Sequence, residues 1–178
     1  MSELLTSSAA FIKPKTGKDL YSYQKGAIHK IFKSFENAPE NYHLLYQLPT
    51  GGGKTVIFSE IVRQYLKHYS KKVVVLTHRI ELCRQTSAML TEFNVTNKVV
   101  NSTANLDDQE SYSCFVAMVE TLNNRLNDDK LDISDIGLVI IDEAHYNSFN
   151  KLFKCCCFNM MTFIYYNHLP VINTEAFK

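Results

Sequence analysis

Residues 44 to 55 read LLYQLPTGGGKT, a short apolar run followed by three consecutive glycines and a Lys-Thr pair. The apolar run is typical of a strand, and apolar residues at helical spacing from Ile57 to Leu66 predict a helix after the glycines. Glycines let a backbone turn tightly with its N–H groups pointing inward, and the N-terminus of a helix attracts negative charge. A strand, a glycine-rich turn and a helix in this order therefore predict a loop that binds phosphate groups.

Two side chains at the end of this loop have distinct predicted roles. Lys54 would reach the β- and γ-phosphates of a nucleotide, and Thr55 would offer its hydroxyl to Mg²⁺. The strict form of the pattern has a glycine where this chain has Leu48. The alternative is a glycine-rich turn with a chance Lys-Thr pair, but the strand before it and the helix after it favour the phosphate loop.

A second polar break follows the apolar run from Leu138 to Ile141, where residues 142–145 read DEAH. Two acids directly after a buried strand are costly unless they face a cation. A Mg²⁺ ion bound to nucleotide phosphate would supply that cation, with Asp142 holding the metal and Glu143 polarising the attacking water. The alternative is a polar loop that only ends the strand.

Strand and helix patterns alternate along most of the chain. The expected helices lie near residues 27–35, 57–66 and 82–93, and the expected strands near 44–48, 73–76, 99–100, 115–119 and 138–141. This alternation predicts crossover connections and an α/β fold with a mostly parallel sheet. Such sheets bind ligands at the carboxyl ends of their strands, and both polar breaks fall at such ends.

Composition narrows the class of protein. The 178 residues make a chain of 20.4 kDa, which has room for one ordinary domain. The formal net charge of +1 excludes a strongly basic coat over the whole chain, although not a local basic stripe. Five cysteines, an odd number, do not indicate a secreted disulfide framework. With no signal-peptide pattern and no apolar run near the ~20 residues that span a bilayer, we expect a cytoplasmic protein without a membrane partner.

Taken together, the two polar breaks resemble the superfamily 2 DEAD/DEAH-box helicases and translocases, and within them the branch of type III restriction subunits. Residues 48–55, LPTGGGKT, are similar to motif I of that family, which itself tolerates the missing first glycine. Residues 142–145 look like its motif II in the DEAH spelling. The resemblance covers about residues 18 to 154. It implies the first RecA-like P-loop NTPase lobe, a three-layer α/β/α sandwich that binds ATP and Mg²⁺.

Two further segments look like the nucleic-acid motifs of the family, in the expected order. Residues 76–79 read LTHR and are similar to motif Ia, which implies that His78 and Arg79 touch a nucleic-acid backbone. Residues 116–122 read VAMVETL and resemble the next such motif, in which Thr121 would contact a phosphate. The restriction-like branch favours DNA by analogy, and RNA stays open.

Upstream of motif I, Tyr23-Gln24 resembles the adenine-reading element of the family, although Tyr21 stands where the family has arginine. Gln24 is therefore the predicted adenine reader. The resemblance assigns catalytic roles to Lys54, Asp142, Glu143 and His145, and metal ligation to Thr55 and Asp142. It assigns nucleotide binding to Gln24, Pro49, Thr50, Gly51, Gly52, Gly53, Lys54 and Thr55.

The predicted domains are an N-terminal extension at 1–17, the ATP-binding lobe at 18–154 and an atypical tail at 155–178. The tail has only Glu175 and Lys178 as charged residues, and its pattern predicts neither a strand nor a helix. Neither motif III nor a second RecA-like lobe is recognisable after motif II. We expect a truncated or frame-shifted reading frame, or a deliberate fragment, that binds ATP with little stand-alone hydrolysis and no strand separation.

Three functions remain open from the residues. The leading hypothesis is the ATP-binding lobe of a DNA helicase or translocase with nucleic-acid-dependent ATP hydrolysis. A small-molecule kinase is a different P-loop enzyme, and residues 77–79 and 142–145 argue against it. The third is a non-catalytic remnant, or a module that pairs with a second lobe or a restriction-system subunit in trans.

Overall fold

The computed structural model describes only part of the chain. The described residues are 19–36, 38–39, 42–49, 51–104, 107–127, 135–142 and 161–166, of which 126–127 and 161–166 are described as backbone alone. Within these ranges, no helix is both long enough and apolar enough to cross a membrane.

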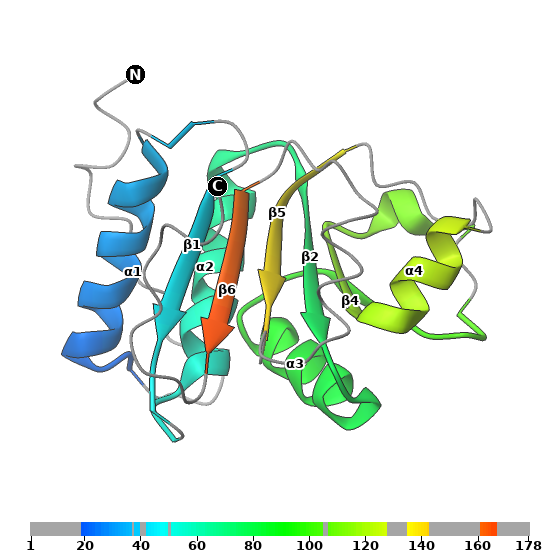
Figure 1. Ribbon diagram of the computed structural model, residues 1–178, viewed down its shortest axis with the longest axis horizontal. Helices are drawn as coiled ribbons and strands as arrows, with labels where there is room; N and C mark the ends of the chain where they lie inside the picture. Colours follow the sequence, from blue (N-terminus) through cyan, green and yellow to red (C-terminus); the bar gives the residue numbers. More distant parts are fainter. Residues whose placement is uncertain are drawn as a thin grey trace.

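The strands form one six-stranded sheet in the order β1-β6-β5-β2-β4-β3, and every neighbouring pair is parallel. They are β1 (His43–Gln47), β2 (Lys72–Thr77), β3 (Asn97–Val100), β4 (Cys114–Met118), β5 (Ile136–Ile141) and β6 (Met161–Tyr166). Because the strands are parallel, their carboxyl ends meet at one edge of the sheet, the lower edge in Figure 1. The predicted α/β fold with a mostly parallel sheet is confirmed.

Helices cover both faces of this sheet. They are α1 (Ser22–Glu36), α2 (Lys54–His68), α3 (Ile80–Glu92) and α4 (Val119–Asn127), with a short 3-10 helix, η1 (Gln109–Ser111). The apolar cluster on one face contains side chains of α1, α2 and α3, and the cluster on the other face contains side chains of α4. Figure 1 shows α2 and α3 behind the strands, α1 beside β1 and α4 on the far side of β2.

Alternate residues of β2 belong to the apolar clusters on the two faces of the sheet. Val73 and Val75 belong to the cluster of α1, α2 and α3, whereas Val74 and Leu76 belong to the cluster of α4. Every residue of β5 is buried, and so is β2 after its first residue. A strand covered on both faces shows no polar alternation, and for this reason its sequence reads as a continuous aliphatic run.

The structure confirms each expected helix and strand with small shifts at the ends, except at 115–119. There the strand ends at Met118, and Val119 begins α4, a helix that the sequence pattern does not predict. Among the residues of α4 whose side chains the structure describes, Val119 and Leu122 belong to the core. The helix has 9 residues, which is shorter than the window of about 11–18 residues in which a helical period is recognised.

The largest difference from the sequence-based expectation is β6. The pattern predicts no strand in 155–178, and for Met161–Tyr166 that prediction is wrong. This strand lies inside the sheet, where residue 163 is opposite Leu44 of β1 and Ile140 of β5. Among the described residues β1 pairs only with β6, so β6 joins β1 to the rest of the sheet.

Candidate functional site

The glycine loop, residues 48–53, connects the end of β1 to the start of α2. Inside the loop the N–H of Gly52 donates to the carbonyl of Pro49 at 3.0 Å. This bond closes a tight turn directly after the strand. Thr50 lies outside the described residues.

Glycine is required in this loop for conformation and for space. The φ angle is +82° at Gly51 and +74° at Gly53, in a region that residues with a side chain rarely adopt. A Cβ atom at Gly53 would lie 2.5 Å from Nε2 of Gln24, and one at Gly52 would lie 2.7 Å from the side chain of Leu48. The loop is therefore packed against its own strand end and against α1.

The first turn of α2 faces this loop. Its N-cap residue, Gly53, has no side chain with which to cap the helix, and Lys54 and Thr55 are half-buried in the first turn. The first N–H groups of a helix have no partner inside it, and they carry the positive end of the helix dipole. Together with the Lys54 ammonium, these donors suit an anion with several oxygen atoms, such as a chain of phosphates.

The start of α1 packs against the same loop. Gln24 is only 3% exposed, and its Oε1 accepts a hydrogen bond from the N–H of Tyr21 at 2.9 Å. The hydroxyl of Tyr23 donates to the carbonyl of Gly52 at 2.9 Å. The sequence pattern marks the Tyr-Gln pair but does not predict this bond, because its partners are 29 positions apart and meet only through tertiary packing.

Asp142 follows the last residue of β5 and is 9% exposed. Its backbone N–H donates to the carbonyl of Leu76 in β2 at 2.9 Å. Since β1 and β5 both pair with β6, and neighbouring strands are about 4.8 Å apart, the strand before Asp142 lies roughly 10 Å from the strand before the glycine loop. Glu143 and His145 lie outside the described residues.

Thr55 and Asp142 offer the kind of oxygen atoms that Mg²⁺ prefers. Mg²⁺ is usually bound through one or two carboxylates together with the phosphates of a substrate. A largely buried carboxylate at the end of β5 and a hydroxyl in the first turn of α2 match that donor set. The residues therefore fit a magnesium–nucleotide complex at this edge of the sheet.

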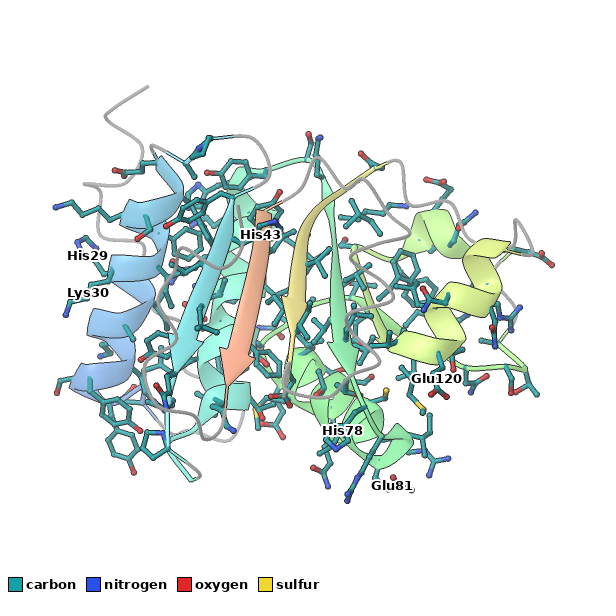
Figure 2. The ribbon with its side chains drawn as sticks, in the orientation of Figure 1. His29, Lys30, His43, His78, Glu81 and Glu120 are labelled. Carbon is teal, nitrogen blue, oxygen red and sulfur yellow. The ribbon has the colours of Figure 1, made fainter. Side chains whose placement is uncertain are left out.

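His78, Arg79 and Thr121 follow two neighbouring strands, β2 and β4. Arg79 is exposed directly before α3, while Thr121 is half-buried in the first turn of α4. Figure 2 shows His78, Glu81 and Glu120 along the lower edge, where the strands end. The three candidates are thus placed by adjacent strands rather than by closeness in sequence.

The sheet order sets the order of the candidates along this edge. The glycine loop follows β1, Asp142 follows β5, Arg79 lies after β2, and Thr121 lies after β4. The hydroxyl of Thr77 donates to the carbonyl of Arg79 at 3.1 Å, which turns the chain from β2 into α3. The candidates for phosphate binding therefore lie toward one end of the edge, and those for a nucleic-acid backbone toward the other.

Comparison with known proteins points to one family. The family model described as "Type III restriction enzyme, res subunit" matches residues 17–167. The protein named "Putative ATP-dependent helicase IRC3" of Saccharomyces cerevisiae is 37% identical over 139 residues. The match covers 74% of this chain and 20% of IRC3, so the chain spans about a fifth of that relative.

Solved structures share the fold. The Hef helicase domain of Pyrococcus furiosus superposes with a TM-score of 0.66 at 22% identity, over 86% of this chain and 33% of that one. The type ISP restriction-modification enzyme LlaGI, solved with a DNA substrate mimic, gives 0.63 at 19% identity, over 88% and 18%. At these identities the likeness shows the fold alone, and it confirms the predicted RecA-like architecture.

Proposed function

Because the chain belongs to the family of type III restriction enzyme res subunits, we propose that it acts as the ATP-binding first lobe of a nucleic-acid-dependent ATPase of the DEAD/DEAH helicase group. The observation that carries the proposal is the shared sheet edge, along which the glycine loop, Asp142 and Arg79 follow one another. The proposed lobe comprises residues 18–154 together with β6, which lies inside the same sheet.

The phosphates of ATP bind in the glycine loop. Backbone N–H groups of the loop and of the first turn of α2 donate to phosphate oxygens, and Lys54 reaches the β- and γ-phosphates. The residues proposed to line the nucleotide are Gln24, Pro49, Thr50, Gly51, Gly52, Gly53, Lys54 and Thr55. Gln24 is proposed to contact the adenine base, and its position at the start of α1 supports this role.

Thr55 and Asp142 would hold Mg²⁺, which neutralises phosphate charge when it is bound. Glu143 is proposed to polarise the attacking water, and His145 to couple the nucleotide site to the rest of a helicase. The family assignment supports these two roles.

DNA is the proposed nucleic acid. His78, Arg79 and Thr121 would contact its phosphates, and contacts of this kind do not depend on base sequence. The restriction family supports DNA over RNA. A second lobe or a restriction subunit is the proposed protein partner.

A cytoplasmic location is also proposed. Cys83 and Cys114 are buried free thiols, and burial raises the pKa of both, which keeps them protonated. Reduced thiols of this kind are typical of the cytosol.

The proposal is tested by titrating ATP with Mg²⁺ into the purified chain by calorimetry. Saturable binding is expected, and Lys54→Ala should weaken it more than tenfold, since a charged donor to phosphate is lost. Lys67→Ala is the matched control, because Lys67 is an exposed lysine in the last turn of the same helix. Absence of ATP binding in the unaltered chain would contradict the proposal.

Nucleic-acid binding is tested separately by fluorescence anisotropy with labelled single-stranded DNA and RNA. Arg79→Ala should weaken DNA binding and leave ATP binding intact, because β5 and β6 separate β2 from β1. Tighter binding of RNA than of DNA would correct the proposed substrate. Binding of ATP together with binding of neither DNA nor RNA would favour a nucleotide-binding module that depends on a partner.

A further inference from the structure

A single hydrogen bond joins the start of α1 to the middle of the glycine loop. The hydroxyl of Tyr23 donates to the carbonyl of Gly52 at 2.9 Å. Tyr23 lies in the first turn of α1, and that helix is fixed in the core by Ile28 and Phe32, which are 1% and 5% exposed. The bond therefore connects a glycine-rich loop, a segment whose backbone can adopt many conformations, to a helix that is fixed in the core.

Gly52 is held at both of its backbone groups. Its N–H donates to the carbonyl of Pro49 at 3.0 Å, and its carbonyl accepts from Tyr23. A trans peptide points its C=O and the following N–H in opposite directions. Holding the carbonyl of Gly52 toward Tyr23 therefore turns the N–H of Gly53, the N-cap residue of α2, away from Tyr23.

The loop needs such a tie because its neighbouring glycines are permissive. Gly51 and Gly53 both have positive φ, and glycine adopts many other conformations at little cost. Without a tie, nucleotide binding would have to order the loop, and that ordering lowers affinity. A loop held in one conformation before binding avoids this loss.

The orientation of the Tyr23 side chain is itself supported. Its ring stacks on the ring of Tyr21, with the centroids 5.8 Å apart and the planes 9° from parallel. Tyr23 also lines the groove between α1 and β1, about 420 Å³ in volume, together with Lys30, Tyr46 and others. Although 50% exposed, the Tyr23 ring is thus guided toward the loop by its stacking partner.

We infer that Tyr23 is a positioning residue of the phosphate site: its hydroxyl holds the carbonyl of Gly52 and thereby fixes the direction of the loop N–H groups before the nucleotide arrives. This inference rests on the proposed function for its consequence in binding, but the bracing of the loop does not need nucleotide. The two parts can therefore be measured separately.

The experiment compares the unaltered chain with Tyr23→Phe, which removes one oxygen atom and keeps the ring. The matched control is Tyr69→Phe, since Tyr69 is also a partly exposed tyrosine stacked on a second tyrosine, Tyr65, but lies after the far end of α2. Hydrogen exchange over residues 48–56 is measured without nucleotide, and ATP and AMP with Mg²⁺ are then titrated by calorimetry. Circular dichroism checks that both variants are folded.

Tyr23→Phe is expected to speed exchange of the loop amides and to weaken ATP about fivefold, the size of one neutral hydrogen bond, with AMP unchanged. The contrast arises because AMP lacks the β- and γ-phosphates that the loop binds. Equal exchange in Tyr23→Phe and the unaltered chain would overturn the inference, and so would equal losses for ATP and AMP. If the unaltered chain binds no ATP, the proposed function fails, and the exchange data alone decide whether Tyr23 braces the loop.

Discussion

At Gly53 the chain has no room for a side chain. The φ angle of +74° costs an alanine about 1–2 kcal/mol, and its Cβ would displace Gln24, whose Nε2 would be only 2.5 Å away. We expect Gly53→Ala to weaken ATP binding at least tenfold in calorimetry. Gly26→Ala is the matched control, because a Cβ there meets no atom within 4 Å and the residue lies inside α1. Unchanged ATP binding by Gly53→Ala would show that the loop can accept another conformation.

Asp142 is the proposed metal-binding residue of the nucleotide site. Its carboxylate is largely buried at the end of β5, where the amide of Asp142→Asn would occupy nearly the same space without the negative charge. We expect the unaltered chain to bind ATP more tightly with Mg²⁺ than after chelation by EDTA, and Asp142→Asn to lose most of this difference. The measurement is a pair of calorimetric titrations for each chain. A variant that keeps the full magnesium effect would remove Asp142 from the proposed metal site.

At the scale of elements, β6 decides whether β1 belongs to the sheet. Residue 163 is opposite Leu44 on one side and Ile140 on the other. Proline there removes a ladder N–H from an interior strand and leaves a neighbouring carbonyl without its donor, so Phe163→Pro should lower the free energy of unfolding by about 1–3 kcal/mol. Urea denaturation measures this loss, and ATP binding should fall with it because β1 carries the glycine loop. Phe163→Leu keeps the N–H and serves as control, and equal stability of the two variants would contradict a strand at this place.

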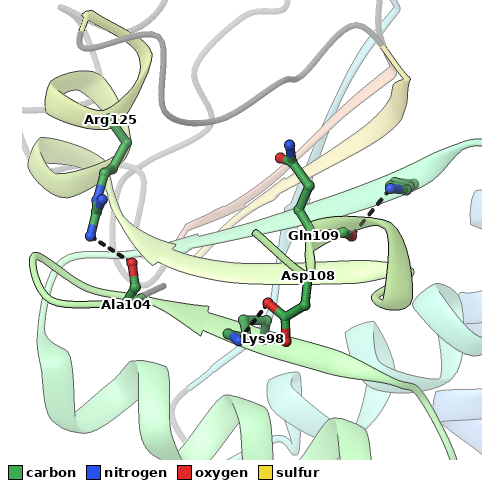
Figure 3. A network of polar contacts seen from close by, with 6 residues as sticks. Lys98, Ala104, Asp108, Gln109 and Arg125 are labelled. Atoms are coloured by element: carbon green, nitrogen blue, oxygen red, sulfur yellow. Dashed lines mark hydrogen bonds and ion pairs between the residues drawn. The ribbon is translucent and has the colours of Figure 1, made fainter. Parts of the chain in front are cut away.

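A second element, α4, is tied to the loop after β3. Figure 3 shows Arg125 of α4 reaching this loop, where its Nη2 donates to the carbonyls of Asn101, Ser102 and Ala104 at 2.8, 2.9 and 2.9 Å. Arg125→Ala leaves these carbonyls without their donor, and we expect a loss of about 1–3 kcal/mol in urea denaturation. Lys98→Ala removes the exposed ion pair with Asp108 in the same region and should change stability much less. The reverse order of the two losses would contradict this account.

The sequence predicts most elements because β2 and β5 are buried on both faces and α1, α2 and α3 each bury one stripe. It does not predict β6, since no glycine, proline or charged residue interrupts residues 155–169, and nothing in the pattern marks where a strand begins or ends. It does not predict α4 either, because that helix has only 9 residues, too few for a helical period to stand out. The missed elements are thus a strand without flanking signals and a short helix.

The candidate site likewise contains residues that the sequence predicts and a contact that it does not. Lys54, Thr55 and Asp142 can be found from sequence because each stands directly after a strand or at a helix start, where the local pattern places it. The bond from Tyr23 to Gly52 cannot be found in this way, since it joins positions 29 residues apart. Local patterns therefore locate the residues proposed to bind phosphate, and only the folded chain shows which contacts surround them.

At the scale of the whole molecule, one sheet edge presents both groups of candidate residues. The glycine loop lies toward the β1 end and Arg79 lies beyond Asp142, so a nucleotide and a nucleic-acid strand could occupy this edge at once. β5 and β2 are hydrogen-bonded neighbours, and the N–H of Asp142 is bonded to Leu76 of β2. A shift of Asp142 on nucleotide binding would therefore be transmitted to β2, the strand that leads to Arg79.

The 178-residue chain corresponds to a small part of a helicase relative. The match to IRC3 covers 20% of that relative, and in comparable phosphoryl-transfer systems an arginine supplied from outside the nucleotide-binding lobe contributes about 10³–10⁵ in rate. We expect the purified chain to bind ATP but to hydrolyse it slowly, with little stimulation by DNA and no separation of strands. Phosphate release with and without DNA, and displacement of a labelled strand from a partial duplex, measure these two activities. Lys54→Ala is the control that identifies contaminating ATPases, because hydrolysis by this chain must be lost with it. ATP-dependent strand separation by the unaltered chain, absent in Lys54→Ala, would show that these residues suffice for the whole reaction.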